Sequence, residues 1–314
     1  MPRKDSRSSA QATDPLPGSP AAHPRGLIVV GVSRSTGSRS AVRWAAAEAE
    51  RRMAGLCIVH AYQLPQLGQP VQHNVDDYLR AEAADLLDGI TDGIRGDHPQ
   101  LDITTRLIQG AAVNALRDES AAAGLTVVGA KESGRLARAI LGSVASAIAA
   151  VNPAPVAVVH PDHAVVGSGP IIVGVDESAG NPAAIEFAFV EADARNTEVM
   201  AVHAWNTTVL KGGVPDYPSI LAQNALEEGA RTMLSTTLAG CAAKYPDVVV
   251  TQAVRRGGAA TVLLEFSQSA SMVVVGRRPR GEFEALVMGS TSRSLTAHSP
   301  CPVVIVHSGD TSHS

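Results

Sequence analysis

One ordered series of short sequence matches occurs twice along the 314 residues of the chain. The apolar run at 27–32 recurs at 171–176, with its glycine displaced by 143 residues. The run at 155–160 recurs at 302–307, at an offset of 147 residues. A period of this length is that of a whole domain rather than that of a solenoid repeat. The sequence therefore predicts two tandem copies of one domain.

Within each copy, short runs rich in β-branched residues alternate with longer Ala-rich segments. The expected strands of the first copy are 27–32, 56–60, 102–107, 125–129 and 156–160. The expected helices are 38–53, 75–95, 111–123 and 143–151, then 181–195, 219–243, 259–270 and 290–298 in the second copy. This alternation is typical of βαβ units and a parallel sheet. The predicted fold is α/β, with two tandem open, mostly parallel five-stranded sheets that carry helices on both faces.

The ends of the chain and the segment between the copies differ in composition from the repeats. Residues 1–25 are rich in Ser, Pro, Gly and Ala and lack the apolar core of a signal peptide, so we expect a disordered tail. The predicted domains are 26–162 and 170–308, joined by a linker at 163–169. Residues 309–314 are expected to form a short C-terminal tail.

Charge and cysteine content exclude several classes of partner. Lys and Arg number 26 against 30 Asp and Glu, which gives no general attraction to nucleic acid or to an anionic membrane. The stretch 139–159 carries no charge, but Pro153 and Pro155 interrupt it, so we expect no membrane span. The three widely spaced cysteines are typical of reduced thiols and predict a cytoplasmic protein.

The first strand of each copy ends in a different residue. Asp176 follows the strand in the second copy, and Ser33 takes that place in the first. In open parallel sheets, ligands bind beyond the carboxyl ends of the strands. A carboxylate there is suited either to accept hydrogen bonds from a ribose or to cap the following helix, and the sequence leaves both roles open.

Glycine followed by hydroxyl residues begins the fourth helix of each copy. Residues 289–292 read Gly-Ser-Thr-Ser, and Gly142-Ser143 occupies the same place in the first copy. Free N–H groups and hydroxyls at a helix start favour phosphate, although Gly-Ser is also a common simple cap. Arg277, Arg278 and Arg280 stand nearby, as phosphate ligands or as a solvated loop.

The order of the elements and a Gly-x-x-Gly-x(9)-Gly-Ser pattern resemble the universal stress protein family from Leu27 to His307. The resemblance implies an ATP site, with Mg²⁺ as the ion that ATP brings. The residues that it implies in the second copy are Gly174, Val175, Asp176, Ala204, Val275, Gly276, Arg277, Gly289, Ser290, Thr291 and Ser292. The weaker site that it implies in the first copy comprises Gly31, Val32, Ser33, Ala61, Val128, Gly129, Gly142, Ser143, Val144 and Ala145.

Both copies depart from the family pattern. The second glycine of the pattern is Glu132 in the first copy and Pro279 in the second. A carboxylate repels phosphate, and proline offers no N–H group. Because Asp176 is present only in the second copy, we expect that copy to bind ATP more tightly.

Enzyme alternatives lack their motifs. Neither copy has the dinucleotide-binding G-x-G-x-x-G after its first strand or the P-loop G-x(4)-G-K-[ST]. His60 and His203 each end an apolar run without a catalytic partner in view, so we expect packed histidines rather than general bases. No cysteine, histidine or carboxylate cluster predicts a metal site.

The sequence thus predicts an ATP-binding stress-response regulatory protein that does not turn over nucleotide. The alternative is an interaction or dimerisation module that keeps the fold without nucleotide. The apolar final strands at 156–159 and 303–306 are expected to meet and to pack the copies as a pseudo-dimer. A homodimer and further protein partners, which the sequence does not name, are compatible with this organisation.

Overall fold

The computed structural model describes residues 26–65, 69–133, 138–140, 142–161, 168–176, 178, 181–205, 220–277 and 288–307. For residues 69–74, 131–133, 138–140 and 220–223 it describes the main chain alone. The predictions of a tail at 1–25 and at 309–314, and most of the predicted linker, lie outside these residues.

The described chain forms two repeats of alternating strands and helices. The first repeat comprises β1 (Leu27–Val32), α1 (Thr36–Arg52), β2 (Gly55–Tyr62), α2 (Gln69–Asp97), β3 (Ile103–Gln109), α3 (Ala112–Glu119), the 3₁₀ turn η1 (Ser120–Ala122), β4 (Leu125–Gly129), β5 (Lys131–Ser133), β6 (Arg138–Ile140), α4 (Ser143–Val151) and β7 (Val156–Val159). The second comprises β8 (Ile171–Gly174), α5 (Asn181–Arg195), β9 (Val199–Trp205), α6 (Ile220–Lys244), β10 (Val250–Arg256), α7 (Ala259–Ser267), β11 (Met272–Gly276), α8 (Ser290–His298) and β12 (Val303–Val306).

The strands of both repeats join in one ten-stranded sheet. Their order is β10-β9-β8-β11-β12-β7-β4-β1-β2-β3. Within this sheet, as far as the chain is described, neighbours from the same repeat are parallel, and β7 and β12, from different repeats, pair antiparallel. The α/β prediction is confirmed, while the two five-stranded sheets are the halves of a continuous one.

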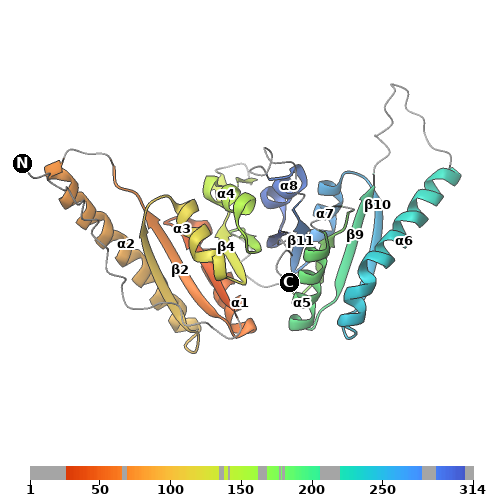
Figure 1. Ribbon diagram of the computed structural model, residues 1–314, viewed down its shortest axis with the longest axis horizontal. Helices are drawn as coiled ribbons and strands as arrows, with labels where there is room; N and C mark the ends of the chain where they lie inside the picture. The colour runs from red at the N-terminus through yellow and green to blue at the C-terminus, as the bar shows by residue number, and fades with distance from the viewer. Residues whose placement is uncertain are drawn as a thin grey trace, which may run out of the picture.

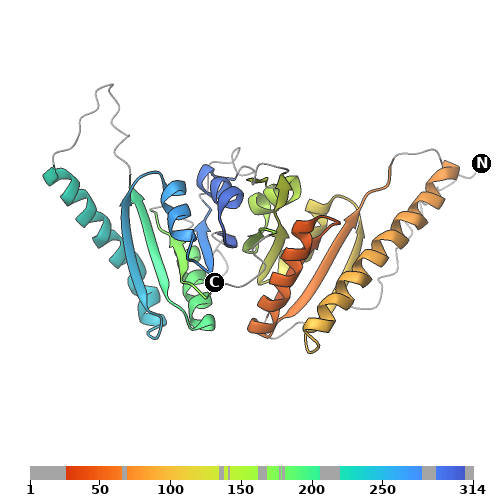
Figure 2. The ribbon, with the colours of Figure 1, turned by 180° about the vertical axis from the view of Figure 1, so that it is seen from behind.

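Helices cover both faces of the sheet. Apolar residues of α1, α2, α5 and α6 share one hydrophobic cluster, and those of α3, α4, α7 and α8 share a second. Successive residues of β1 alternate between the clusters, with Val30 in the first and Val29 in the second. Strands buried on both faces explain why the sequence reads as continuous β-branched runs. In Figures 1 and 2, α2 and α6 lie at the outer ends of the molecule and α4 and α8 at its centre.

The two repeats share unusual backbone details as well as order. Met53 and Asn196, at equivalent positions after α1 and α5, both adopt left-handed conformations, with φ of 52° and 50°. Gly110 and Gly257 follow β3 and β10 with φ of 145° and 153°. Glycine adopts such angles without a steric penalty. Shared backbone exceptions indicate that the repeats are copies of one structure.

One feature of the first repeat escaped sequence prediction. Strands β5 and β6 form an antiparallel two-stranded sheet in which Glu132 pairs with Ala139. Strands of three residues are too short to show a periodic pattern. The predicted helix at 111–123 is also shorter, because α3 gives way to the 3₁₀ turn η1 at Ser120.

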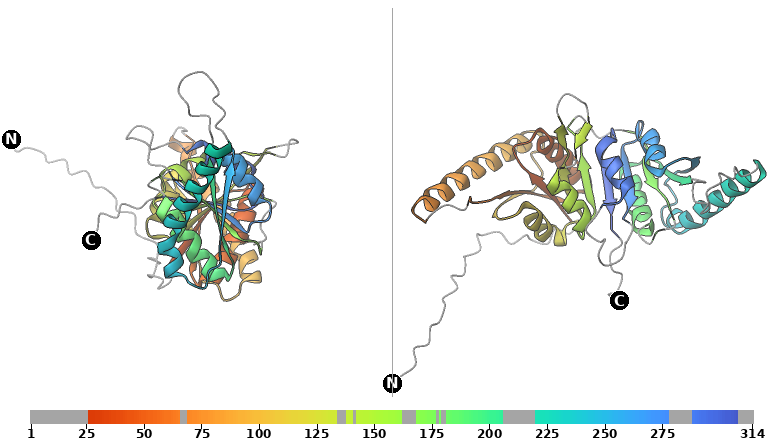
Figure 3. Two further views of the ribbon diagram at one scale, coloured as in Figure 1. Left: turned by 90° about the vertical axis from the view of Figure 1, so that its right-hand side faces the viewer. Right: turned by 90° about the horizontal axis from the view of Figure 1, so that it is seen from above.

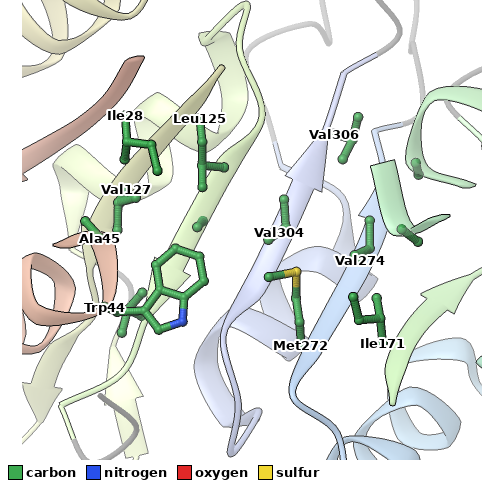
Figure 4. Close-up of a cluster of buried hydrophobic side chains, with 14 of the residues drawn as sticks. Ile28, Trp44, Ala45, Leu125, Val127, Ile171, Met272, Val274, Val304 and Val306 are labelled. Carbon is green, nitrogen blue, oxygen red and sulfur yellow. The ribbon is translucent and has the colours of Figure 1, made fainter. Parts of the chain in front are cut away.

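The repeats meet where β7 pairs with β12, the two strands that were expected to come together. Val303 stands opposite Val158, and Ile305 opposite Val156. Both hydrophobic clusters contain residues from the two repeats. Figure 4 shows side chains from both, among them Trp44 of α1 and Val304 of β12, within one cluster. Seen from above in Figure 3, the halves lie side by side along the long axis.

A cluster of charged side chains also crosses between the repeats. Arg52 of α1 lies 2.6 Å from Glu191 of α5, and Arg195 of α5 lies 2.8 Å from Glu48 of α1. Glu48 and Glu191 are equivalent positions, as are Arg52 and Arg195, so the contacts are reciprocal across the two halves. Arg51 adds a further ion pair to Glu48. We call these five residues the junction charges.

Burial determines how the two carboxylates of this cluster ionise. Burial raises the pKa of Glu48, but Arg195, Arg52 and Arg51 outweigh it and lower that pKa to about 2. The pKa of Glu191 is raised, first by burial. Arg52 and Arg195 lower it, but the negative charge of Glu48 opposes their effect. The cluster thus depends on its arginines to keep charge inside the protein.

Removing one arginine tests this dependence. We expect Arg195→Met to lower the free energy of unfolding, measured in urea, by about 3–5 kcal/mol, because it leaves buried carboxylates undercompensated. The matched control is Lys244→Met, which removes an exposed ion pair with Glu186 and should leave the unfolding midpoint almost unchanged. Similar losses in both variants would contradict a stabilising role for the junction charges.

Candidate functional site

Each repeat contains a pocket at the carboxyl ends of its strands. In the second repeat, β9 and β10 lie to one side of β8 and β11 lies to the other, so the direction of strand connection reverses between β8 and β11. Crevices at such switch points are where open α/β sheets bind ligands. The pocket there has a volume of about 310 Å³, within the usual range for a small-molecule site. We call it the second-repeat pocket.

All eleven residues that the sequence assigned to the second copy line this pocket. They are Gly174, Val175, Asp176, Ala204, Val275, Gly276, Arg277, Gly289, Ser290, Thr291 and Ser292. The other lining residues, which the sequence analysis did not find, are Ala149, Val202, Ala259, Leu263, Met288 and Ile305. These six are small or apolar side chains whose position in the sequence carries no sign of a ligand.

Asp176 takes part in the turn that leads into α5. The main-chain N–H of Ser178 donates a hydrogen bond to Oδ1 of Asp176 at 2.9 Å. The side-chain amide of Asn181 donates to the main-chain carbonyl of Asp176. The carboxylate of Asp176 thus has a hydrogen-bond partner in the turn before α5, and it also lines the pocket.

Arg277 brings positive charge to the pocket wall. Its main-chain N–H donates to the carbonyl of Val306 at 2.8 Å, which fixes the residue at the end of β11. Burial lowers the pKa of the Arg277 guanidinium, which nevertheless keeps its charge at neutral pH. Among the described residues, no carboxylate pairs with it.

The start of α8 adds hydrogen-bond donors to the same pocket. Gly289 is the N-cap residue, and it has no side chain that could accept from the first-turn N–H groups. Ser290, Thr291 and Ser292 in that turn line the pocket. Uncapped N–H groups at the positive end of a helix favour an anion.

The equivalent pocket of the first repeat lies between the ends of β1 and β4 and has a volume of about 510 Å³. All ten residues assigned to the first copy line it, namely Gly31, Val32, Ser33, Ala61, Val128, Gly129, Gly142, Ser143, Val144 and Ala145. Arg34, Ser35, Ser38, Val59, His60, Ala112 and Leu116 complete the lining. We call it the first-repeat pocket.

Hydroxyl groups replace the carboxylate in the first-repeat pocket. Ser33 Oγ lies 3.0 Å from Ser35 Oγ and 3.1 Å from Ser38 Oγ. The main-chain N–H of Ser33 donates to Ser38 Oγ at 2.8 Å. These three serines form hydrogen bonds with one another at the start of α1. Because Ser33 is neutral, the position equivalent to Asp176 carries no charge.

The cations also differ between the pockets. Ala130 of the first repeat occupies the position that corresponds to Arg277, and it is 1% exposed. Arg34 lines the first-repeat pocket but forms an ion pair with Glu82. The charged groups suited to an anionic, hydroxyl-bearing ligand therefore gather in the second-repeat pocket.

Gly129, the first glycine of the motif in the first repeat, has a structural function. A Cβ atom there would lie 2.3 Å from the main-chain oxygen of Gly37 in α1. The close approach of α1 to β4 requires glycine whatever the pocket holds.

Two predictions about the loops after the fourth strands are not tested by the described residues. Arg278, Pro279 and Arg280 lie outside the described residues. Glu132 belongs to β5, of which the structure describes the main chain alone. The expectations attached to these four residues stay predictions.

His60 and His203 play matching roles at the ends of β2 and β9. Nδ1 of His60 lies 2.9 Å from the carbonyl oxygen of Val32, and Nδ1 of His203 lies 2.9 Å from that of Val175. Each imidazole thus donates to the end of the neighbouring strand. A ring nitrogen held by a main-chain carbonyl orders the strand ends, as expected for a packed histidine.

Within the described ranges, no group of three His, Cys, Asp or Glu side chains is arranged to hold a metal ion. Among the same residues, no helix combines the length and the apolar character needed to cross a bilayer. Cys57, Cys241 and Cys301 are free thiols.

The fold and the pockets define an open α/β protein, built twice, with a ligand-sized crevice at the switch point of each repeat. Its sequence matches the universal stress protein family over residues 25–160 and again over 168–307. The chain belongs to this family, as a tandem member.

Known proteins of similar length support this assignment. A universal stress protein of Mycobacterium tuberculosis strain H37Rv is 33% identical over 298 residues, covering 88% of this chain and 95% of that one. A universal stress protein of Mycolicibacterium smegmatis is 31% identical, covering 89% of this chain and 96% of that one. The crystal structure of a universal stress protein from Archaeoglobus fulgidus covers 90% of this chain and 98% of that one at 16% identity, with a TM-score of 0.67, and shows the same fold.

Proposed function

We propose that the chain is a stress-response regulatory protein that binds ATP in the second-repeat pocket and does not turn it over. The observation that carries the proposal is the difference between equivalent positions. Asp176 and Arg277 line the second-repeat pocket, whereas Ser33 and Ala130 stand in their places in the first repeat.

The chemistry of the second-repeat pocket suits the three parts of ATP. Apolar side chains such as Leu263 and Val202 offer surface to an adenine ring. The carboxylate of Asp176 lines the pocket and is an acceptor suited to ribose hydroxyls. Arg277 and the first turn of α8 are donors for phosphate oxygens.

Regulation rather than catalysis follows from what these groups supply. Binding accelerates a reaction only where contacts are stronger in the transition state than in the bound substrate. Among the described lining residues of the second-repeat pocket there is one carboxylate, and Ser178 already donates to it. ATP would bring Mg²⁺ with it, so the protein needs no metal cluster of its own.

Titration calorimetry on the intact chain tests the ligand and the position of the site. We expect Asp176→Ala to weaken the tightest ATP-binding event about 10- to 100-fold, because a hydrogen bond to a charged group contributes about 1.5–3 kcal/mol. Asp176→Asn keeps an acceptor for Ser178 N–H but removes the charge, so it separates ribose binding from helix entry. Ser33→Ala is the matched control in the first repeat and should leave the tightest event unchanged, as should Ser143→Ala.

Three outcomes of such titrations would contradict the proposal. If Asp176→Ala binds ATP as tightly as the native chain, the second-repeat pocket is not the principal site. If the native chain binds no adenine nucleotide, the fold serves as an interaction module instead. Cyclic AMP carries a single phosphate charge and one free ribose hydroxyl. If it binds more tightly than ATP, cyclic AMP rather than ATP is the ligand of the pocket.

Hydrolysis is tested separately, by following ADP release chromatographically from highly purified protein with ATP and Mg²⁺. We expect ADP to accumulate no faster than in a protein-free control. Sustained release that a single substitution within 276–292, such as Ser290→Ala, abolishes would show that the protein is an ATPase.

A further inference from the structure

Helix α4 of the first repeat contributes to both pockets. Its first turn, with Ser143 and Val144, lines the first-repeat pocket. Further along the same helix, Ala149 lines the second-repeat pocket, opposite residues that otherwise all come from the second repeat. Ala149 is 1% exposed and belongs to the hydrophobic cluster that contains Val303 and Ile305 of β12. One short helix thus extends from one crevice to the other.

A second element of the first repeat reaches the same region. Strand β6 lies against α8, the helix whose first turn supplies Ser290, Thr291 and Ser292 to the second-repeat pocket. Figures 1 and 2 place α4 and α8 next to each other at the centre of the molecule. The first repeat therefore touches the second-repeat pocket directly through Ala149 and also supports one of its walls.

The contact is not reciprocal. Thr296 of α8 is the counterpart of Ala149, and it is fully buried. Its hydroxyl donates to the main-chain oxygen of Ser292 at 2.8 Å. Thr296 is not among the described residues that line the first-repeat pocket. The second-repeat pocket is therefore shared between the repeats, whereas the described lining of the first-repeat pocket comes entirely from its own repeat.

We propose that α4 of the first repeat is a wall of the nucleotide site in the second repeat, so that Ala149 sets the room available to the ligand and the first repeat regulates its affinity. This inference rests on the proposed function for the identity of the ligand. Ala149 acts by its small size, because a larger side chain at a buried position must extend into the cavity or displace its neighbours.

Thermodynamic linkage gives the proposal a second consequence. If α4 forms part of the bound site, ATP binds better to states in which α4 is in place than to states in which it has opened. Coupling of this kind is reciprocal, so ATP bound in the second repeat must stabilise α4 in the first. Helix α3 of the first repeat does not line the second-repeat pocket and gives an internal reference.

The size of residue 149 is tested by substitution in the full chain. We expect Ala149→Val to weaken ATP binding at the second-repeat pocket at least tenfold in titration calorimetry. The matched control is Ala150→Val, which adds the same volume at the next buried position of α4, a residue that lines neither pocket. Its ATP affinity should stay within twofold of the native value.

Hydrogen exchange on the unmodified chain tests the linkage and does not depend on a variant that folds. With ATP at about 100 times its Kd, we expect exchange of the α4 amides near Ala149 to slow at least tenfold, consistent with the stabilisation that such an excess of ligand provides. Amides of α3 should change less than twofold. In Asp176→Ala at the same ATP concentration, the slowing of α4 exchange should shrink by about the factor by which the substitution weakens ATP binding.

The outcomes separate this inference from the proposed function. Absence of any ATP binding by the native chain removes the proposed function and this inference with it. ATP binding that Asp176→Ala weakens, combined with native affinity in Ala149→Val and unprotected α4 amides, overturns the inference alone. Protection of α4 that is as strong in Asp176→Ala as in the native chain comes from the first-repeat pocket and also overturns it.

Discussion

The antiparallel pairing of β7 with β12 is the constraint on which the rest of the structure depends. An apolar final strand left at a sheet edge favours association with other chains, and here each repeat covers the edge of the other. Through this pairing, each hydrophobic cluster continues from one repeat into the other. The pairing also places Glu48 and Arg52 against Glu191 and Arg195. A displaced repeat would leave these buried charges without their partners, which is costly.

Duplication kept the framework and changed the chemistry of the pockets. Both repeats retain the glycine N-cap, the histidine at the end of the second strand and the left-handed residue after the first helix. The pockets differ at the ends of the first and fourth strands. The second repeat has Asp176 and Arg277 where the first repeat has Ser33 and Ala130. One repeat carries the groups suited to an anionic ligand, and the other contributes a supporting wall through α4.

Much of this arrangement was predictable because the two copies can be aligned, so that a pattern seen in one is checked at the equivalent positions of the other. The bounds of β1, β4, α4, α5 and α8 follow the sequence pattern, and the predicted site residues gather around two pockets. The β5–β6 hairpin was too short to predict. The junction charges and Ala149 were missed because their role arises from contacts between repeats. An i,i+4 Glu–Arg pair repeated at an offset of 143 was the available signal for the junction charges.

The central claim is that two similar pockets differ in nucleotide affinity, with the second repeat providing the principal site. Equilibrium dialysis of the intact chain against labelled ATP measures this directly, because it counts nucleotide bound per chain at each concentration. The account predicts a first plateau at one ATP per chain, followed at much higher concentration by a weaker second event. Two ATP molecules bound with equal affinity, or none at any concentration, would contradict it.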